Sequence, residues 1–356
     1  IFQDKKYEVV EDHNDHRVTM QIIARVDANR DIGAGHAVRV RAIAHALGSD
    51  DQLLVIGKGK ELRSIFPYAE ILEPTELLPV QLSSAVDELN AELVLCDHPD
   101  LEPYLRYDLE QQLGIPVIII DDFGGDHRAS GIVNGTVLPT HHRYPKMPDH
   151  SQKLCGSEYA LLRPSFSQPN GPSTPSRTIG IVIGSGNRST NWADFLTTNG
   201  TILTQMGTVG IVVGVAHPEP EVLAKACAMH GISFYQALSE VDLAKFLASS
   251  EIALVTGGMV VYESLATGTP TIIFPILRNM VAEADWFAAK GCAVNLGPND
   301  GFDTTTLCKV IASLLADPNT RNRMARRGHK LVDGLGISRV CTELGKHFNL
   351  TTGARP

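Results

Sequence analysis

A single histidine follows a glycine-rich turn near the start of the chain, in the stretch NRDIGAGH that ends at His36. An apolar, strand-like run precedes this turn and a helical pattern follows it, so we expect His36 at the N-terminus of a helix. The positive end of a helix dipole disfavours imidazolium, and a neutral imidazole is the usual general base near neutral pH. His36 is therefore a candidate general base, with helix capping or phosphate binding as the simpler alternatives.

Charged residues and glycines surround this histidine. Asp27, at the end of the preceding strand, either orients the imidazole or is an ordinary turn residue. Arg39, one helical turn after His36, either holds an anionic group or is a solvated surface side chain. Gly33 and Gly35 allow the backbone to turn tightly and to approach a ligand closely. We take His36 and Asp27 as candidate catalytic residues, and the other three as candidate substrate-binding residues.

A second glycine turn lies in the other half of the chain, in LVTGGMVVYESLATGTPTIIFPI. The unpaired N–H groups where a helix follows Gly257 and Gly258 suit a diphosphate, and the backbone of Met259 extends this turn. Glu263 either accepts hydrogen bonds from a ribose diol or is an exposed helix carboxylate. The turn VIGSGN has the same outline but is less specific, and it supplies the candidates Gly184, Ser185, Gly186 and Asn187.

Carboxylates and imidazoles gather at two further strand ends, in CDHPD and IDDFGGDH. Their residue types could bind a metal ion. However, their spacing matches no zinc or calcium pattern, so we expect no metal and take Asp97 and His98 as ligands for sugar hydroxyls. Asp121 and Asp122 belong to the second cluster. His141 and His142 lie in a proline-rich stretch, where we expect solvated side chains.

Short apolar runs alternate with helical patterns along the chain, which is typical of parallel sheets with helical crossovers. The Pro/Ser/Gly-rich stretch from Arg163 to Arg177 interrupts this alternation. We therefore expect an α/β protein with two Rossmann-like domains that face each other across a cleft. The expected divisions are residues 1–20 as a remnant of a preceding domain or linker, 21–165 as an N-terminal Rossmann-like domain, 166–177 as a linker, and 178–350 as a C-terminal Rossmann-like domain. In the helix after His36, the four-residue spacing of Val38, Ala42 and Ala46 predicts one apolar face.

Composition excludes several classes of function. The chain of 356 residues carries a formal net charge of -9 and has no basic run, which argues against nucleic-acid binding. The six cysteines are widely spaced, without a C-x-x-C pair, which is typical of reduced thiols. No apolar run is long enough for a membrane span, so we expect a soluble, cytoplasmic protein.

Several motifs occur together in a recognisable order: DANRDIGAGHAVRVRAIAHAL, DHPDLEPY, VIIIDDF, IVNGT, YALLRPSF, VIGSGN, TGGMVVYESLATGTPTI and WFAAKGCAVNLG. In these motifs the chain resembles the UDP-2,4-diacetamido-2,4,6-trideoxy-β-L-altropyranose hydrolases of pseudaminic acid synthesis and the spore-coat polysaccharide proteins of the same type. The resemblance runs from about Ile22 to Leu335. This group in turn resembles the GT-B glycosyltransferases, particularly the lipid II-forming N-acetylglucosaminyltransferase.

The resemblance implies a GT-B fold in which the C-terminal half holds UDP and the N-terminal half faces the sugar. It implies hydrolysis without metal or cofactor, in which His36 activates water for inverting attack on the anomeric carbon. Glu263 would bind the ribose and the backbone of Gly257, Gly258 and Met259 the diphosphate. We also place Asn134, in IVNGT, and Asn279, in RNM, among the substrate-binding residues.

The chain departs from its relatives at two positions and extends beyond them at its start. Met259 stands where the relatives usually have Ser or Thr, and Met280 where they carry Gln. The N-terminal stretch YEVVEDHNDHRVTMQIIARVD resembles the junction in fusion proteins where an acylneuraminate cytidylyltransferase domain precedes this module. A fused or associated cytidylyltransferase is therefore an expected partner, besides the UDP-sugar.

Three functions fit these features. A two-domain cleft can transfer a sugar to water or to another acceptor, and the fold alone does not separate hydrolase from transferase. The sequence lacks a hydrophobic membrane-facing loop like that of enzymes with lipid-linked acceptors, which favours the hydrolase. A non-catalytic nucleotide-sugar binding module that regulates the cytidylyltransferase is the third possibility.

Overall fold

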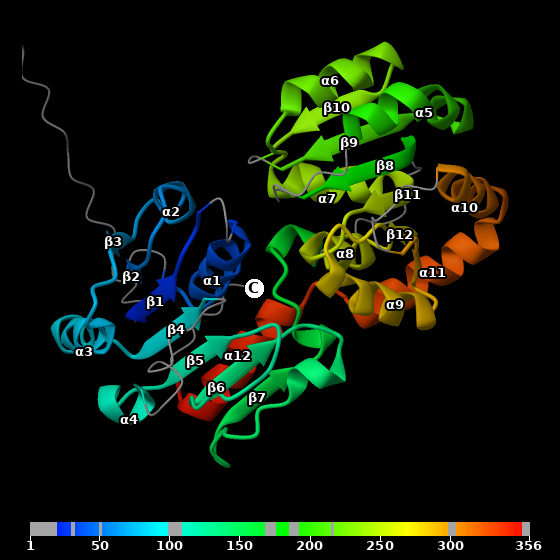
Figure 1. The fold of residues 1–356 in the computed structure, drawn as a ribbon. Helices are drawn as coiled ribbons and strands as arrows, with labels where there is room; N and C mark the ends of the chain where they lie inside the picture. The colour runs from blue at the N-terminus through cyan, green and yellow to red at the C-terminus, as the bar shows by residue number, and fades with distance from the viewer. Residues whose placement is uncertain are drawn as a thin grey trace, which may run out of the picture.

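A computed structural model describes residues 20–29, 33–49, 52–98, 109–167, 176–184, 192–214, 217–297 and 304–350 (Figure 1). The expectations for residues 1–19, including the cytidylyltransferase junction, lie outside these ranges. So do the candidates Ser185, Gly186 and Asn187. None of the helices within these ranges is long and apolar enough to cross a membrane.

The N-terminal domain is built on a parallel sheet with the strand order β3-β2-β1-β4-β5-β6-β7. Its central strands are mostly apolar and buried, because a parallel sheet is covered on both faces, with Arg25 and Asp97 as buried charged exceptions. The described strands are β1 (Ile22–Val26), β2 (Leu53–Ile56), β3 (Glu70–Leu72), β4 (Leu93–Asp97), β5 (Val117–Ile120), β6 (Gly131–Asn134) and β7 (Gln152–Cys155). The described helices between them are α1 (Gly35–Ala46), α2 (Leu62–Ile65), α3 (Leu78–Leu89) and α4 (Leu109–Leu113).

The C-terminal domain repeats this plan with the strand order β10-β9-β8-β11-β12-β13, again with parallel pairs. Its strands are β8 (Arg177–Ile183), β9 (Val209–Val213), β10 (Ser233–Gln236), β11 (Ser250–Val255), β12 (Thr271–Ile273) and β13 (Ala293–Asn295). Its helices are α5 (Trp192–Met206), α6 (Pro220–Met229), α7 (Glu240–Ala248), α8 (Met259–Ala266), α9 (Val281–Ala289), α10 (Thr304–Ala316) and α11 (Pro318–Leu331). Two Rossmann-like domains are thus present, as the alternation of the sequence predicts.

The last helix, α12 (Gly336–Phe348), returns to the N-terminal domain. Its apolar face, formed by Ile337, Val340 and Leu344, packs into the same core as α1 and the central strands of that domain. The structure therefore differs from the expected division, in which residues 178–350 form one domain. The C-terminal domain ends before α12, and the chain crosses between the domains twice.

The first crossing holds the domains together by apolar and ionic contacts. A 3₁₀ turn, η4 (Pro164–Phe166), occupies the start of the expected linker, and Phe166 is buried in one cluster with Leu265 and Phe287 of the C-terminal domain. Arg163 pairs with Glu263 across the domains at 2.8 Å. This connection fixes how α8 lies relative to the N-terminal sheet.

Helix α1 begins at Gly35, so His36 lies in its first turn, as the glycine-rich stretch predicts. The buried face of α1 differs from the expected one. Ala37, Val40 and Ile43 are its buried apolar residues, together with Ala44, whereas Val38, Ala42 and Ala46 are only half-buried. Arg39 is buried as well. The buried side of α1 is therefore the side on which Arg39 bonds to Asp97, at the end of β4.

Strand order determines where ligands can bind. In each sheet the chain moves outward from a first strand and then returns to that strand's other side, so that a crevice forms between β1 and β4 and another between β8 and β11. Most candidate residues of the N-terminal half follow β1 and β4, whereas Asn134 ends β6. In the described part of the C-terminal half most follow β8 and β11, whereas Asn279 follows β12. The topology therefore gathers both groups of candidates at the carboxyl ends of the strands.

Candidate active site

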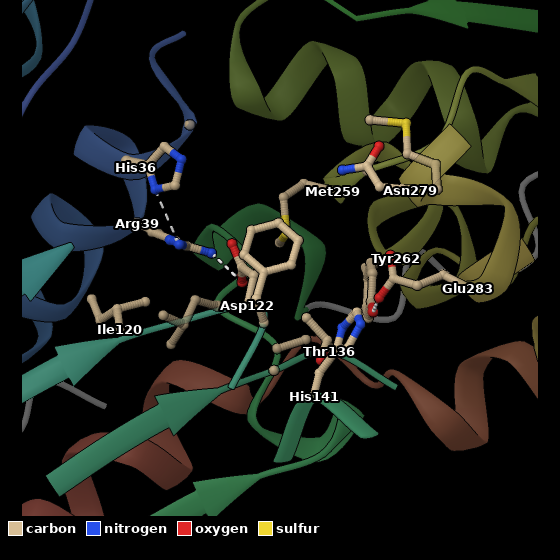
Figure 2. Close-up of a pocket in the computed structure, with 17 residues that line it drawn as sticks. His36, Arg39, Ile120, Asp122, Thr136, His141, Met259, Tyr262, Asn279 and Glu283 are labelled. Carbon is tan, nitrogen blue, oxygen red and sulfur yellow. Dashed lines mark hydrogen bonds and ion pairs between the residues drawn. The ribbon is translucent and has the colours of Figure 1, made fainter. Parts of the chain in front are cut away.

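A cavity of about 350 Å³ lies between the two domains (Figure 2). The N-terminal domain contributes residues from α1 and from the loops after β5 and β6, and the C-terminal domain contributes α8, α9 and η5 (Arg278–Met280). Polar side chains face it from both sides. These polar lining residues are His36, Arg39, Asp122, Thr136, His141, Tyr262, Asn279 and Glu283.

The imidazole of His36 is held by a buried carboxylate. Its Nδ1 lies 2.6 Å from Oδ1 of Asp97, the last residue of β4. An ionised carboxylate oxygen can only accept, so Nδ1 donates in this contact, and Arg39 Nη2, which lies 3.1 Å from Nδ1, donates to Asp97 Oδ1 instead. The other nitrogen, Nε2, then carries a lone pair and faces the cavity (Figure 2). This is the arrangement of a general base, with Asp97 as the group that orients it.

Arg39 secures this carboxylate. Its guanidinium donates to Asp97 through Nε at 2.5 Å and Nη2 at 2.8 Å, and to Asp122 through Nη1 at 2.8 Å. Burial alone would raise the pKa of Asp97, but the charge and hydrogen bonds of Arg39, with those of His36, hold this pKa below its ordinary value. Arg39 itself is only 9% exposed. Its charge is thus engaged by two carboxylates, and its place in the site is to position Asp97 and Asp122.

Asp27 has different partners from those expected. Its carboxylate accepts hydrogen bonds from the Arg25 guanidinium and from the Lys58 backbone N–H at 2.9 Å, and it contacts His98 Nε2 at 3.0 Å. The carboxylate that touches His36 is Asp97, because Arg39 ties α1 to the end of β4 rather than to β1. The structure thus gives the orienting contact to Asp97, and it places Asp27 and His98 in a neighbouring buried cluster.

The glycine turn before α1 has the geometry that the sequence indicates. Gly33 has a φ of +83° and donates its N–H to the Asn29 carbonyl at 2.7 Å. Gly35 lines the cavity, with no atom within 4 Å of the position that a Cβ would take. The turn therefore brings the backbone to the cavity wall beside His36.

The opposite wall is the turn that leads into α8. Gly257 and Gly258 have φ values of +101° and +70°, which L-residues with side chains rarely adopt. Gly258 and Met259 line the cavity, and the first N–H groups of a helix lack partners within it, although here the Val261 N–H donates to the Gly258 carbonyl at 3.0 Å. Gly184 is joined to the same strand end, because its N–H donates to Thr256 Oγ1 at 3.2 Å. This wall can bind an anion through backbone N–H groups.

Two expected substrate ligands are engaged within the protein. Glu263 is 8% exposed, accepts a hydrogen bond from Arg163 and is not among the cavity-lining residues. Burial raises the pKa of Glu263, and the charge of Arg163 opposes this shift. Asn134 is fully buried, with its amide donating to Tyr144 and the His141 carbonyl and its oxygen accepting from Thr136. Asn134 therefore shapes the loop that carries Thr136 and His141, whereas Asn279 lines the cavity as expected.

Several cavity residues, Thr136 among them, had no matching expectation as ligands. His141, expected to be solvated, lies at the cavity wall with its ring centroid 5.8 Å from that of Phe123. Tyr262 and Glu283 come from α8 and α9, in stretches that look like ordinary amphipathic helix. No local pattern distinguishes them, since their shared position depends on the packing of α9 against α8. Within the described part of the chain, no three His, Cys, Asp or Glu side chains gather as a group that could hold a metal ion.

Comparison with known proteins agrees with the two-domain architecture. No family model matches the chain. The chain is distantly related to the spore coat polysaccharide biosynthesis protein SpsG of Bacillus subtilis (strain 168), with 21% identity over 337 residues that cover 88% of this chain and 94% of that protein.

Two solved structures have the same fold. A UDP-GlcNAc 2-epimerase from Neisseria meningitidis bound to UDP-GlcNAc matches with a TM-score of 0.60 and 12% identity, over 92% of this chain and 100% of that one. A glycosyltransferase from Rickettsia africae ESF-5 matches with a TM-score of 0.59 and 12% identity, over 94% and 100%. The fold is therefore of the GT-B type shared by glycosyltransferases and UDP-sugar epimerases.

Proposed function

We propose that this protein hydrolyses a UDP-sugar at its anomeric carbon and releases UDP. The observation that carries the proposal is the pair of His36 and Asp97, held with Nε2 facing a cavity whose other wall is the N-terminus of α8. A general base on one wall and an anion-binding turn on the other are the two parts that this reaction needs. The sugar expected from the sequence resemblance is a diacetamido-trideoxy hexose of nonulosonic acid biosynthesis.

In the reaction, a water oxygen attacks the anomeric carbon while its proton passes to His36 Nε2. The bond between that carbon and the β-phosphate oxygen breaks, and its electron pair leaves with UDP. Asp97 stabilises the imidazolium that forms, because it is ionised and bonded to Nδ1. Attack from the side opposite the leaving group inverts the configuration at this carbon. A diphosphate is stable as an anion, so the step requires no proton donor on the α8 side.

UDP binds on the C-terminal wall in this proposal. The turn from Gly257 to Met259 receives the diphosphate, and Glu263, four residues into α8, accepts the ribose hydroxyls. In the structure Glu263 accepts a hydrogen bond from Arg163, which belongs to the connection between the domains. The same carboxylate would therefore bind both Arg163 and the ribose. The UDP-GlcNAc complex of the Neisseria epimerase, which has the same fold, supports a nucleotide sugar as ligand.

Replacing Glu263 with glutamine is expected to weaken UDP binding by about tenfold, the effect of losing roughly 1.4 kcal/mol of charge-assisted hydrogen bonding. Isothermal titration calorimetry with UDP measures this change, and addition of a metal chelator should leave the affinity unchanged. Glu240→Gln is the matched control, because Glu240 also contacts the connection between the domains, through the Ser165 N–H at 2.7 Å, but does not belong to the α8 turn. An equal loss of UDP affinity in both variants would contradict this assignment of Glu263. Weaker UDP binding in the presence of the chelator would contradict binding without a metal.

Transfer to a sugar acceptor is a second candidate, favoured by one observation. Phe123 lines the cavity and remains 56% exposed, and an exposed aromatic ring offers a stacking surface for a second sugar. In that case His36 would take its proton from an acceptor hydroxyl rather than from water. The identity of the attacking oxygen separates the two reactions.

A further inference from the structure

The cavity wall across from His36 carries a hydrogen-bonded pair from two helices of the C-terminal domain. The hydroxyl of Tyr262, on α8, donates to Oε1 of Glu283, on α9, at 2.8 Å. Both residues line the cavity, and Figure 2 shows them beside His141 and Thr136. The mechanism above uses neither of them.

Packing fixes the position of this pair. Tyr262 is 3% exposed, and its ring meets that of Phe287 edge to face, with 5.3 Å between the centroids. The Val137 backbone, from the N-terminal domain, lowers the pKa of the Glu283 carboxyl. One carboxylate oxygen is thus held by the tyrosine, whose ring is fixed by packing against Phe287.

The charges around the pair are unbalanced. Arg39 is the one Arg or Lys among the described cavity-lining residues, and its guanidinium is bonded to Asp97 and Asp122. The charge of Asp122 acts on Glu283, and His141 lies beside Glu283 (Figure 2). Burial raises the pKa of Glu283 and Asp122 adds to this shift, whereas the hydrogen bond from Tyr262 lowers it. Apolar residues, including Ile120, Leu161 and Met280, form much of the remaining wall.

A wall of this kind discriminates between sugars. A carboxyl group accepts hydrogen bonds from a sugar O–H or N–H. A sugar carboxylate next to Asp122 and Glu283 would instead meet like charge, and Arg39, the one Arg or Lys among the described lining residues, is already bonded to Asp97 and Asp122. We propose that Tyr262 and Glu283 determine sugar specificity, by binding a hydrogen-bond-donating substituent of a neutral sugar and by excluding acidic sugars. This inference rests on the proposed function and extends it to the sugar.

UDP, UDP-glucose and UDP-glucuronate test the inference, because the last two differ only at carbon 6. Calorimetry with the full chain should show UDP-glucose binding at least roughly tenfold more tightly than UDP-glucuronate, and Glu283→Gln should reduce this ratio to about threefold or less. UDP alone should bind with the same affinity to the wild type and to Glu283→Gln. Glu88→Gln, which removes the same charge from an exposed position on α3, should leave the ratio unchanged.

Tyr262→Phe keeps the packed ring and provides an independent test. It should weaken UDP-glucose binding several-fold and leave UDP binding unchanged, because only the position of the Glu283 carboxyl is altered. An unchanged ratio in Glu283→Gln, or a wild type that binds UDP-glucuronate as well as UDP-glucose, would overturn the inference while the proposed function stands. Failure of the wild type to bind UDP would overturn both.

Discussion

Replacing His36 with asparagine is expected to lower the turnover number by two to four orders of magnitude, the usual effect of losing a general base. Asparagine can still bond to Asp97, so the buried pair of Asp97 and Arg39 is retained. UDP affinity should change little, because the proposed UDP site is the turn before α8 on the other wall. Steady-state release of UDP from a nucleotide sugar, with UDP affinity measured by calorimetry, gives both quantities.

The matched control is His45→Asn, which changes an exposed histidine of the same helix. It should leave turnover within about twofold of the wild type, since surface substitutions of this kind have small effects. A loss of UDP affinity equal to the loss of turnover in His36→Asn would make His36 a ligand group instead. Unchanged turnover would favour the non-catalytic binding module.

Replacing Asp97 with asparagine is expected to lower turnover by about three orders of magnitude. An asparagine no longer holds the proton on Nδ1 or stabilises the imidazolium, which is the known effect of losing the orienting carboxylate in other imidazole-based sites. The matched variant Asp27→Asn removes a buried carboxylate of the neighbouring cluster. Because Asp27 does not contact His36, turnover per folded molecule should fall by less than about tenfold. Similar losses in both variants would contradict the assignment of the orienting role to Asp97.

Asp97→Asn should also destabilise the fold, by roughly 3 kcal/mol at pH 7, because Arg39 loses its buried partner and keeps only the half-buried Asp122. The pKa of Asp97 is lowered in the folded protein. Its contribution to stability is therefore present above the unfolded-state pKa of about 4 and is lost as the pH falls through the folded value. The difference in unfolding free energy between wild type and variant, measured by urea denaturation, should shrink in acid.

The sequence predicts the architecture well because parallel sheets leave a strong pattern. Continuous apolar runs such as Val117–Ile120 are buried, and glycine turns follow several of the strands at their carboxyl ends. This pattern predicts the two domains. It also predicts the position of His36 in the first turn of α1 and the turn before Met259. Helix α12 was not expected, since its apolar face meets α1 across about 300 residues of chain, a relation that local periodicity does not contain.

Side-chain partnerships were less predictable. Choosing between Asp27 and Asp97 as the partner of His36 requires the strand order, which places β4 beside β1, and the inward turn of Arg39. Asn134 resembles a ligand in its motif, but its amide is fully used by its own loop. Tyr262 and Glu283 meet only because α9 packs beside α8, and no motif contains both.

The source of the attacking oxygen tests the central claim, which is that water attacks the anomeric carbon of a UDP-sugar. The protein, incubated with neutral UDP-sugars in ¹⁸O-labelled water and without another acceptor, is expected to release UDP that contains no label and a free sugar that carries one labelled oxygen at its anomeric carbon. His36→Asn should reduce this release in proportion to its loss of turnover. Label in the phosphate of UDP, or UDP release only when a second sugar is supplied, would contradict hydrolysis at the anomeric carbon.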